Sequence, residues 1–158
     1  MKAIYTSIFL LACYQSAIAE IGYIFEADLN GDGFEDSIMS GPYGMFGNGG
    51  GPFLLSLSKA DGTFAKQAIG LHPKAAALEK NGEKSKIWGY WHSSAKSGEL
   101  GYTMLDGSFK TEYITLYFEP DTDGINRKIY ELIFNKNQLI KFKKIENYIP
   151  PEYPWGKG

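Results

Sequence analysis

The sequence predicts a mostly β protein: a single antiparallel domain, either a sandwich or a blade-like sheet, of about eight or nine strands. Two observations support this class. Four dipeptides typical of tight hairpin turns recur along the chain, and the runs between them are rich in Ile, Tyr, Phe, Thr and Leu. The turn dipeptides are Asp61-Gly62, Asn81-Gly82, Asp106-Gly107 and Asp123-Gly124. A chain of 158 residues is expected to form one hydrophobic core.

The strand-like runs can be placed in order. Residues 21–25 and 37–39 flank a polar loop, and further strands are expected at 53–58, 86–92, 102–105, 111–119, 128–134 and 138–144. Within the run 111–119, residues 112–118 are apolar on both alternations, which predicts a central strand buried on two faces. One short helix is expected near 74–80 (KAAALEK), because Pro73 precedes this segment and Asn81-Gly82 would end it.

The N-terminal residues 1–19 predict an export signal. Lys2 precedes an apolar run, and a small-residue site ends at Ala19, where cleavage would release a periplasmic or secreted protein. An alternative is a lipid anchor through Cys13, because Leu10-Leu11-Ala12-Cys13 resembles a bacterial lipobox. The apolar run is shorter than the ~20 residues that a transmembrane helix needs, so no transmembrane segment is expected.

Charge and cysteine content narrow the function classes. The chain has 16 basic and 18 acidic residues, and this balance gives no electrostatic case for nucleic-acid binding. Cleavage after Ala19 would leave no cysteine, so the exported domain, residues 20–148, must be held by its core or by a bound metal. Residues 149–158 are proline-rich and predict an extended tail, with Tyr153 and Trp155 lying against the domain. The alternative for this tail is a peptide arm offered to a partner.

The segment from Asp28 to Asp36 carries the clearest chemistry. It places oxygen-bearing side chains at loop positions one, three, five and nine, and Gly33 at position six permits a sharp turn. Position seven is expected to contribute its backbone carbonyl. This set of oxygen ligands suits Ca²⁺; the ligands are Asp28, Asn30, Asp32, the Phe34 carbonyl and Asp36. Position twelve is Met39 instead of Glu, so a loop between two strands is expected in place of a helix–loop–helix site. The alternative is a plain hairpin turn with solvated acids.

Residues 24–64 also resemble a known type of repeat. The D-x-N-x-D-G-x-x-D loop, the glycine-rich GNGGGPF (47–53) and DGTF (61–64) together look like the FG-GAP/VCBS type of calcium-loop repeat. The resemblance implies calcium-ligand roles for the four loop side chains named above. The motif occurs once, so the resemblance does not extend to a propeller, which repeats it in every blade. The later Asp121–Gly124 segment is expected to be a turn only.

Two further places are candidate binding residues. Met45 and Phe46 lie in the glycine-rich stretch 41–51. Their side chains are expected either to contact a partner from the tip of this loop or to fold back and pack into the core. Trp88 and Tyr90 share one face of a predicted strand, where they could stack on sugar rings or pack in the core.

The sequence contains no convincing catalytic signature. Ser93-Ser94-Ala95-Lys96 matches an S-x-x-K motif, but the companion motifs of that enzyme class are missing from the sequence. We therefore expect a non-enzymatic, calcium-stabilised module that binds another envelope or extracellular protein, as an adaptor, an inhibitor or an immunity-type protein. The alternatives are a carbohydrate or cell-wall binding module that uses Trp88, Tyr90 and Trp155, and a small extracytoplasmic hydrolase.

Overall fold

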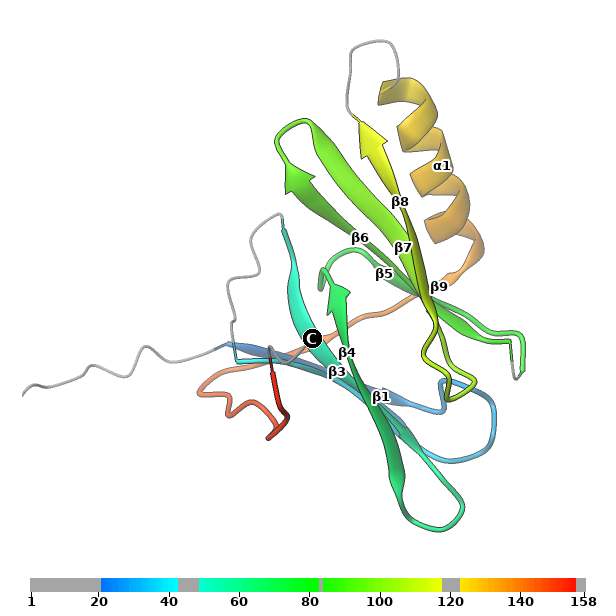
Figure 1. Cartoon of the computed structure of the whole chain (residues 1–158), viewed down its shortest axis with the longest axis vertical. Helices are drawn as coiled ribbons and strands as arrows, with labels where there is room; N and C mark the ends of the chain where they lie inside the picture. The colour runs from blue at the N-terminus through cyan, green and yellow to red at the C-terminus, as the bar shows by residue number, and fades with distance from the viewer. Residues whose placement is uncertain (1–20, 43–48, 83, 118–122, 156–158) are drawn as a thin grey trace, which may run out of the picture.

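The computed structural model of the chain describes residues 21–42, 49–82, 84–117 and 123–155. Its strands form two antiparallel sheets of five strands each, with one α-helix beside the second sheet (Figure 1). The predicted mostly β, antiparallel class is therefore confirmed. The predicted signal peptide at 1–19, Cys13, Met45, Phe46, Asp121 and Thr122 lie outside the described residues. The hairpin turn predicted at Asp123-Gly124 is wrong, because these two residues begin the α-helix.

The first sheet has the strand order β10-β1-β2-β3-β4. Its strands are β1 (Gly22–Ala27), β2 (Asp36–Ser40), β3 (Gly51–Ser58), β4 (Phe64–Leu71) and β10 (Lys143–Ile145). The second sheet has the order β8-β7-β6-β5-β9. Its strands are β5 (Ala76–Glu79), β6 (Lys86–Ser94), β7 (Ser97–Met104), β8 (Thr111–Tyr117) and β9 (Gln138–Leu139), and α1 (Asp123–Lys136) follows β8.

Two hydrophobic clusters hold these layers together. The larger cluster joins the two sheets, and its members include Ile38, Phe53 and Leu55 from the first sheet and Leu78 and Ile87 from the second. The smaller cluster lies between α1 and the other face of the second sheet; it contains Ala75, Ala77, Leu100, Leu116 and Phe134. The second sheet is therefore covered on both faces near its centre, by the first sheet and by α1.

The helix expected near 74–80 is not present, because residues 76–79 form β5. Ala76, Ala77 and Leu78 are at most 2% exposed, and neighbouring residues of the strand point into different clusters. Alanine favours a helix in isolation, but here tertiary burial on both faces decides the conformation.

The strand expected at 128–134 is also wrong, because these residues belong to α1. Apolar residues recur four apart in this segment, as in Ile129 and Ile133, which is helical spacing. Asn137 donates a hydrogen bond from Nδ2 to the Ile133 carbonyl (2.8 Å) and so caps the end of the helix. The predicted strand 138–144 is divided between β9 and β10, which belong to different sheets.

The prediction of a central buried strand at 111–119 is corrected as well. β8 is an edge strand of the second sheet, and Leu116 is its one buried residue. Tyr113, Ile114 and Tyr117 are 65%, 53% and 65% exposed. Apolar residues on both faces of a strand show that the strand is hydrophobic, but they do not fix its place in the sheet. The pattern therefore could not distinguish an edge strand from a central one.

The C-terminal segment lies against the first sheet, as its aromatic residues predict. Tyr148 is buried and donates a hydrogen bond from its hydroxyl to the Ser40 carbonyl (2.8 Å). Trp155 packs so closely on Gly41 that a Cβ at this glycine would lie 2.9 Å from the indole ring. Within the described ranges, no helix is both long and apolar enough to cross a membrane.

Candidate functional site

The loop that joins β1 to β2 is organised around Asp28. Its carboxylate accepts hydrogen bonds from the amides of Gly31 (2.7 Å), Asp32 (3.2 Å) and Gly33 (3.1 Å). Gly31 and Gly33 have φ of +83° and +88°, a conformation that side chains other than glycine rarely adopt. The predicted sharp turn at Gly33 is therefore present, with a second left-handed glycine two residues before it.

The side chains of Asn30 and Asp32 also accept hydrogen bonds from backbone amides that follow them in the loop. The Asn30 side-chain oxygen accepts a hydrogen bond from the Asp32 amide (3.1 Å), and the Asp32 carboxylate accepts one from the Phe34 amide (2.9 Å). The Asn30 amide group also donates to the Asp32 carboxylate (2.9 Å). Side chains at loop positions one, three and five are thus brought together within one short turn.

Asp36 occupies the core side of the loop. It is 1% exposed, and its two carboxylate oxygens accept hydrogen bonds from the amides of Leu29 (2.9 Å) and Ser58 (2.8 Å). Burial raises the pKa of Asp36 above its ordinary value, since it disfavours the charged form, and the nearby negative charge of Asp32 acts in the same direction. The hydrogen bonds from the backbone amides oppose this rise in pKa.

The side chains of the loop offer oxygen donors of the type that calcium takes, but they are not gathered around one point. Three carboxylates and an amide oxygen form a hard anionic set of oxygen donors, of the kind that Ca²⁺ prefers. In the part of the chain that the structure describes, no three acidic, His or Cys side chains are gathered as a metal-ligand group. Calcium coordination would therefore require the carboxylates of Asp28, Asp32 and Asp36 to converge further.

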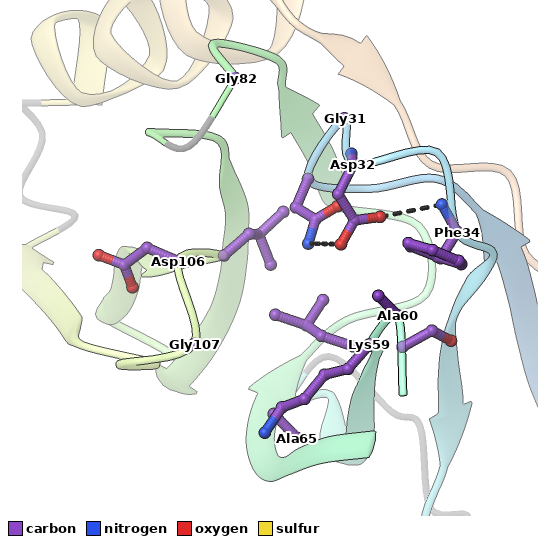
Figure 2. A pocket seen from close by; sticks show the side chains of 13 residues that line it. Gly31, Asp32, Phe34, Lys59, Ala60, Ala65, Gly82, Asp106 and Gly107 are labelled. Atoms are coloured by element: carbon purple, nitrogen blue, oxygen red, sulfur yellow. Dashed lines mark hydrogen bonds between the residues drawn. The ribbon is translucent and has the colours of Figure 1, made fainter. Parts of the chain in front are cut away.

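A cleft of about 810 Å³ lies directly beside this loop (Figure 2). Its walls come from the 28–36 loop, from the end of β3 and the turn into β4, and from the turns that follow β5 and β7. The lining residues are Asn30, Gly31, Asp32, Phe34, Leu57, Ser58, Lys59, Ala60, Ala65, Gly82, Leu105, Asp106 and Gly107. The cleft therefore forms where turns from both sheets meet at one end of the molecule.

The cleft combines an apolar lining with charged groups. Leu57 and Leu105, which are at most 3% exposed, line it together with the ring of Phe34, which is 41% exposed. Asp32, Asp106 and Lys59 supply exposed charges of both signs. Hydrogen bonds to Asp106 from the Ser108 hydroxyl (2.5 Å) and amide (3.0 Å) lower its pKa, because they stabilise the ionised carboxylate.

Backbone contacts between the turns hold the cleft walls in place. The amide of Leu105 donates to the Ser85 carbonyl (2.9 Å), and the Ser85 hydroxyl donates to the Gly82 carbonyl (2.6 Å). A Cβ built on Gly31 would lie 4.0 Å from the Gly82 Cα atom. The candidate calcium loop of the first sheet therefore lies beside the β5–β6 turn of the second sheet.

The aromatic residues proposed for sugar binding do not share a surface. Trp88 and Tyr90 are half-buried in the cluster beneath α1, and the Trp88 indole donates to Glu79 (2.7 Å). Trp155 instead lies against Gly41, which follows β2 of the first sheet. The structure thus uses Trp88 and Tyr90 in packing, and it separates them from Trp155.

Sequence reasoning missed the residues that complete the cleft, above all Ser58, Lys59, Leu105 and Asp106. The Asp61-Gly62, Asn81-Gly82 and Asp106-Gly107 dipeptides predicted hairpin turns, and the structure has turns at all three. These turns meet at one end of the molecule because of the way the two sheets pack, and the residues of a turn do not determine that packing. Comparison with protein-family models, with curated proteins and with solved structures finds no match for the chain.

Proposed function

We propose that the protein is an exported, calcium-stabilised β domain that binds another envelope or extracellular protein and does not catalyse a reaction. The observation that supports this proposal is the position of the cleft, one wall of which is the 28–36 loop. A cation bound by that loop would fix this wall and so couple calcium to partner binding. The FG-GAP/VCBS-like spacing of the loop is the sequence feature that favours calcium.

The lining of the cleft suits a protein partner. An apolar side chain of the partner could pack on the exposed ring of Phe34. Charged residues around that side chain could pair with Lys59 or with Asp32 and Asp106. Such a combination of an apolar centre and a polar rim is typical of protein interfaces.

Calcium would act on the loop itself. The ligands would be Asp28, Asn30, Asp32, the Phe34 carbonyl and Asp36, and the ion would supply positive charge where these carboxylates lie. That charge would offset the repulsion between Asp32 and Asp36, which contributes to the raised pKa of the buried carboxyl group.

A thermal melt with calcium or with chelator tests the metal part of the proposal. Saturating calcium should raise the melting temperature of the wild type by about 5–10 °C at a hundredfold excess over the dissociation constant. Asp32→Ala should abolish this rise. Asp61→Ala is the matched control, because Asp61 is another exposed turn aspartate that accepts hydrogen bonds from Thr63 but lies outside the loop. A wild-type melt that is indifferent to both calcium and chelator would refute a calcium site.

Partner capture from cell-envelope extract tests the binding part. The wild type should retain one stoichiometric protein in calcium and release it in chelator. Ala60→Trp, which fills the cleft from an exposed position, should lose that protein. Ala95→Trp is the control, since Ala95 is an equally exposed alanine in the turn between β6 and β7 and does not line the cleft. Equal retention by both variants, or recovery of glycan alone, would contradict the proposal.

A further inference from the structure

The edge strand β8 differs from the other sheet edges. It is seven residues long, six of these residues are exposed, and none of them is proline. β9 has two residues, whereas β10 has three, two of which are Lys143 and Lys144. The remaining edge strand, β4, carries Lys66. Short length and lysines are common devices that prevent edge-to-edge pairing, and β8 has neither of them.

The hydrogen-bond pattern shows which residues of β8 face outward. The amide of Met104 donates to the Lys110 carbonyl (2.9 Å), so this pair in the β7–β8 ladder is a hydrogen-bonded one. Hydrogen-bonded and non-hydrogen-bonded pairs alternate in an antiparallel ladder, and the register pairs Thr103 with Thr111 and Leu100 with Ile114. Glu112 and Ile114 therefore direct their backbone groups toward β7. Thr111, Tyr113 and Thr115 direct theirs toward the open side of the strand.

We propose that β8 pairs antiparallel with β8 of a second copy of this chain, across a twofold axis at Ile114. The two second sheets would then form one continuous sheet, with five strands from each copy. In this register Thr111–Tyr117 overlaps along its whole length, and Tyr113 forms a hydrogen-bonded pair with the partner's Thr115. Ile114 meets the partner's Ile114, which would cover an aliphatic side chain that is 53% exposed in one copy.

The charges of β8 favour a second copy as the occupant. Glu112 is the one charged residue of the strand, and it already forms an ion pair with Lys110 (2.6 Å) in its own chain. In the proposed register Glu112 lies opposite the partner's Leu116. The two glutamates are then about 13 Å apart along the strands, which exceeds the Debye length at physiological salt. No like charges meet, so the strand is complementary to itself. This self-association surface is separate from the cleft.

Sedimentation of the purified protein over a wide concentration range tests the proposal. The wild type should show a reversible monomer–dimer equilibrium. Ile114→Lys should raise the dimer dissociation constant by about tenfold or more, because two like charges would oppose each other at the twofold axis. Leu132→Lys, which changes a similarly exposed aliphatic residue on α1 (55%), should leave the equilibrium unchanged.

A charge exchange makes the test specific for the twofold register. Ile114→Glu alone should weaken the dimer as Ile114→Lys does, but an equimolar mixture of the two variants should restore dimerisation. Circular dichroism and thermal melts confirm that each variant is folded. A wild type that stays monomeric at high concentration would overturn the proposal and leave a strand from another protein as the occupant of the edge. A dimer that survives Ile114→Lys would overturn it too, since the contact would lie elsewhere.

Discussion

The Asp36 carboxylate accepts a hydrogen bond from the Ser58 amide at 2.8 Å, across 22 positions of the chain. The second carboxylate oxygen accepts from the Leu29 amide (2.9 Å), within the candidate calcium loop. Ser58 ends β3 and lines the cleft, so one buried side chain connects the loop to the neighbouring cleft wall. Asp36 therefore has a structural role whether or not a metal is bound.

Asp36→Ala should lower the free energy of unfolding by about 2–4 kcal/mol, because it leaves two backbone amides without their acceptor. The measurement is urea unfolding in chelator, so that any loss of metal binding does not contribute. Asp61→Ala, at an exposed turn, should cost much less. A loss at Asp36 no greater than that at Asp61 would show that the two amides find other partners.

The pH dependence of stability should differ between buried and exposed aspartates. Burial raises the pKa of Asp36 above 3.8, so the folded state binds this proton more tightly than the unfolded chain does. Its contribution to stability therefore falls as the pH rises from 3.8 through the folded pKa. Hydrogen bonds from Thr63 lower the pKa of Asp61, so its contribution is present above 3.8 and is lost as the pH falls through the lower, folded pKa.

Carboxyl-carbon NMR titration of the metal-free protein checks these directions. On acidification Asp36 should protonate before Asp61 and before Asp106, whose pKa is also lowered. Asp36→Asn should abolish the decrease in unfolding free energy that Asp36 causes as the pH rises above 3.8. If Asp36 titrated below Asp61, its two amide hydrogen bonds would outweigh its burial.

Gly22 and Tyr148 provide a test of how the C-terminal segment is held. A Cβ at Gly22 would lie 2.0 Å from the Tyr148 ring, so Gly22→Ala must displace this buried tyrosine and its bond to Ser40. We expect a loss of about 1–3 kcal/mol in unfolding free energy and faster proteolysis of the segment after Tyr148. Gly70→Ala is the control, because a Cβ at this strand glycine meets no atom within 4 Å. Equal behaviour of the two variants would contradict the packing.

Part of the candidate site could be predicted from sequence because it is local. The spacing from Asp28 to Asp36 and the position of Gly33 lie within nine consecutive residues, and the structure has the expected turn between two strands. The cleft could not be predicted, because Leu57 belongs to β3 of the first sheet whereas Leu105 lies in the turn that follows β7 of the second. The inward position of Asp36 also depends on a distant partner, the Ser58 amide.

The fold was predictable to a similar extent. Turn dipeptides and β-rich runs predicted the antiparallel class and most strands up to β8. They failed where tertiary contacts override local preference, as in β5, whose alanines are buried on both faces. The exposed position of β8 was missed for a related reason, since strand order is set by pairing and not by the composition of the strand itself.

The helix that sequence analysis missed has a face that can be tested directly. Phe134 is 6% exposed in the cluster between α1 and the second sheet, whereas Leu132 on the same helix is 55% exposed. Phe134→Ala should cost about 3–5 kcal/mol, because it removes a large buried side chain and leaves a cavity. Leu132→Ala should cost less than about 1 kcal/mol, because an exposed side chain loses little burial. Urea unfolding of the two variants gives both values. Similar losses would mean that α1 packs on the sheet through a different face. Leu132→Lys would then no longer serve as the control variant in the self-association experiment.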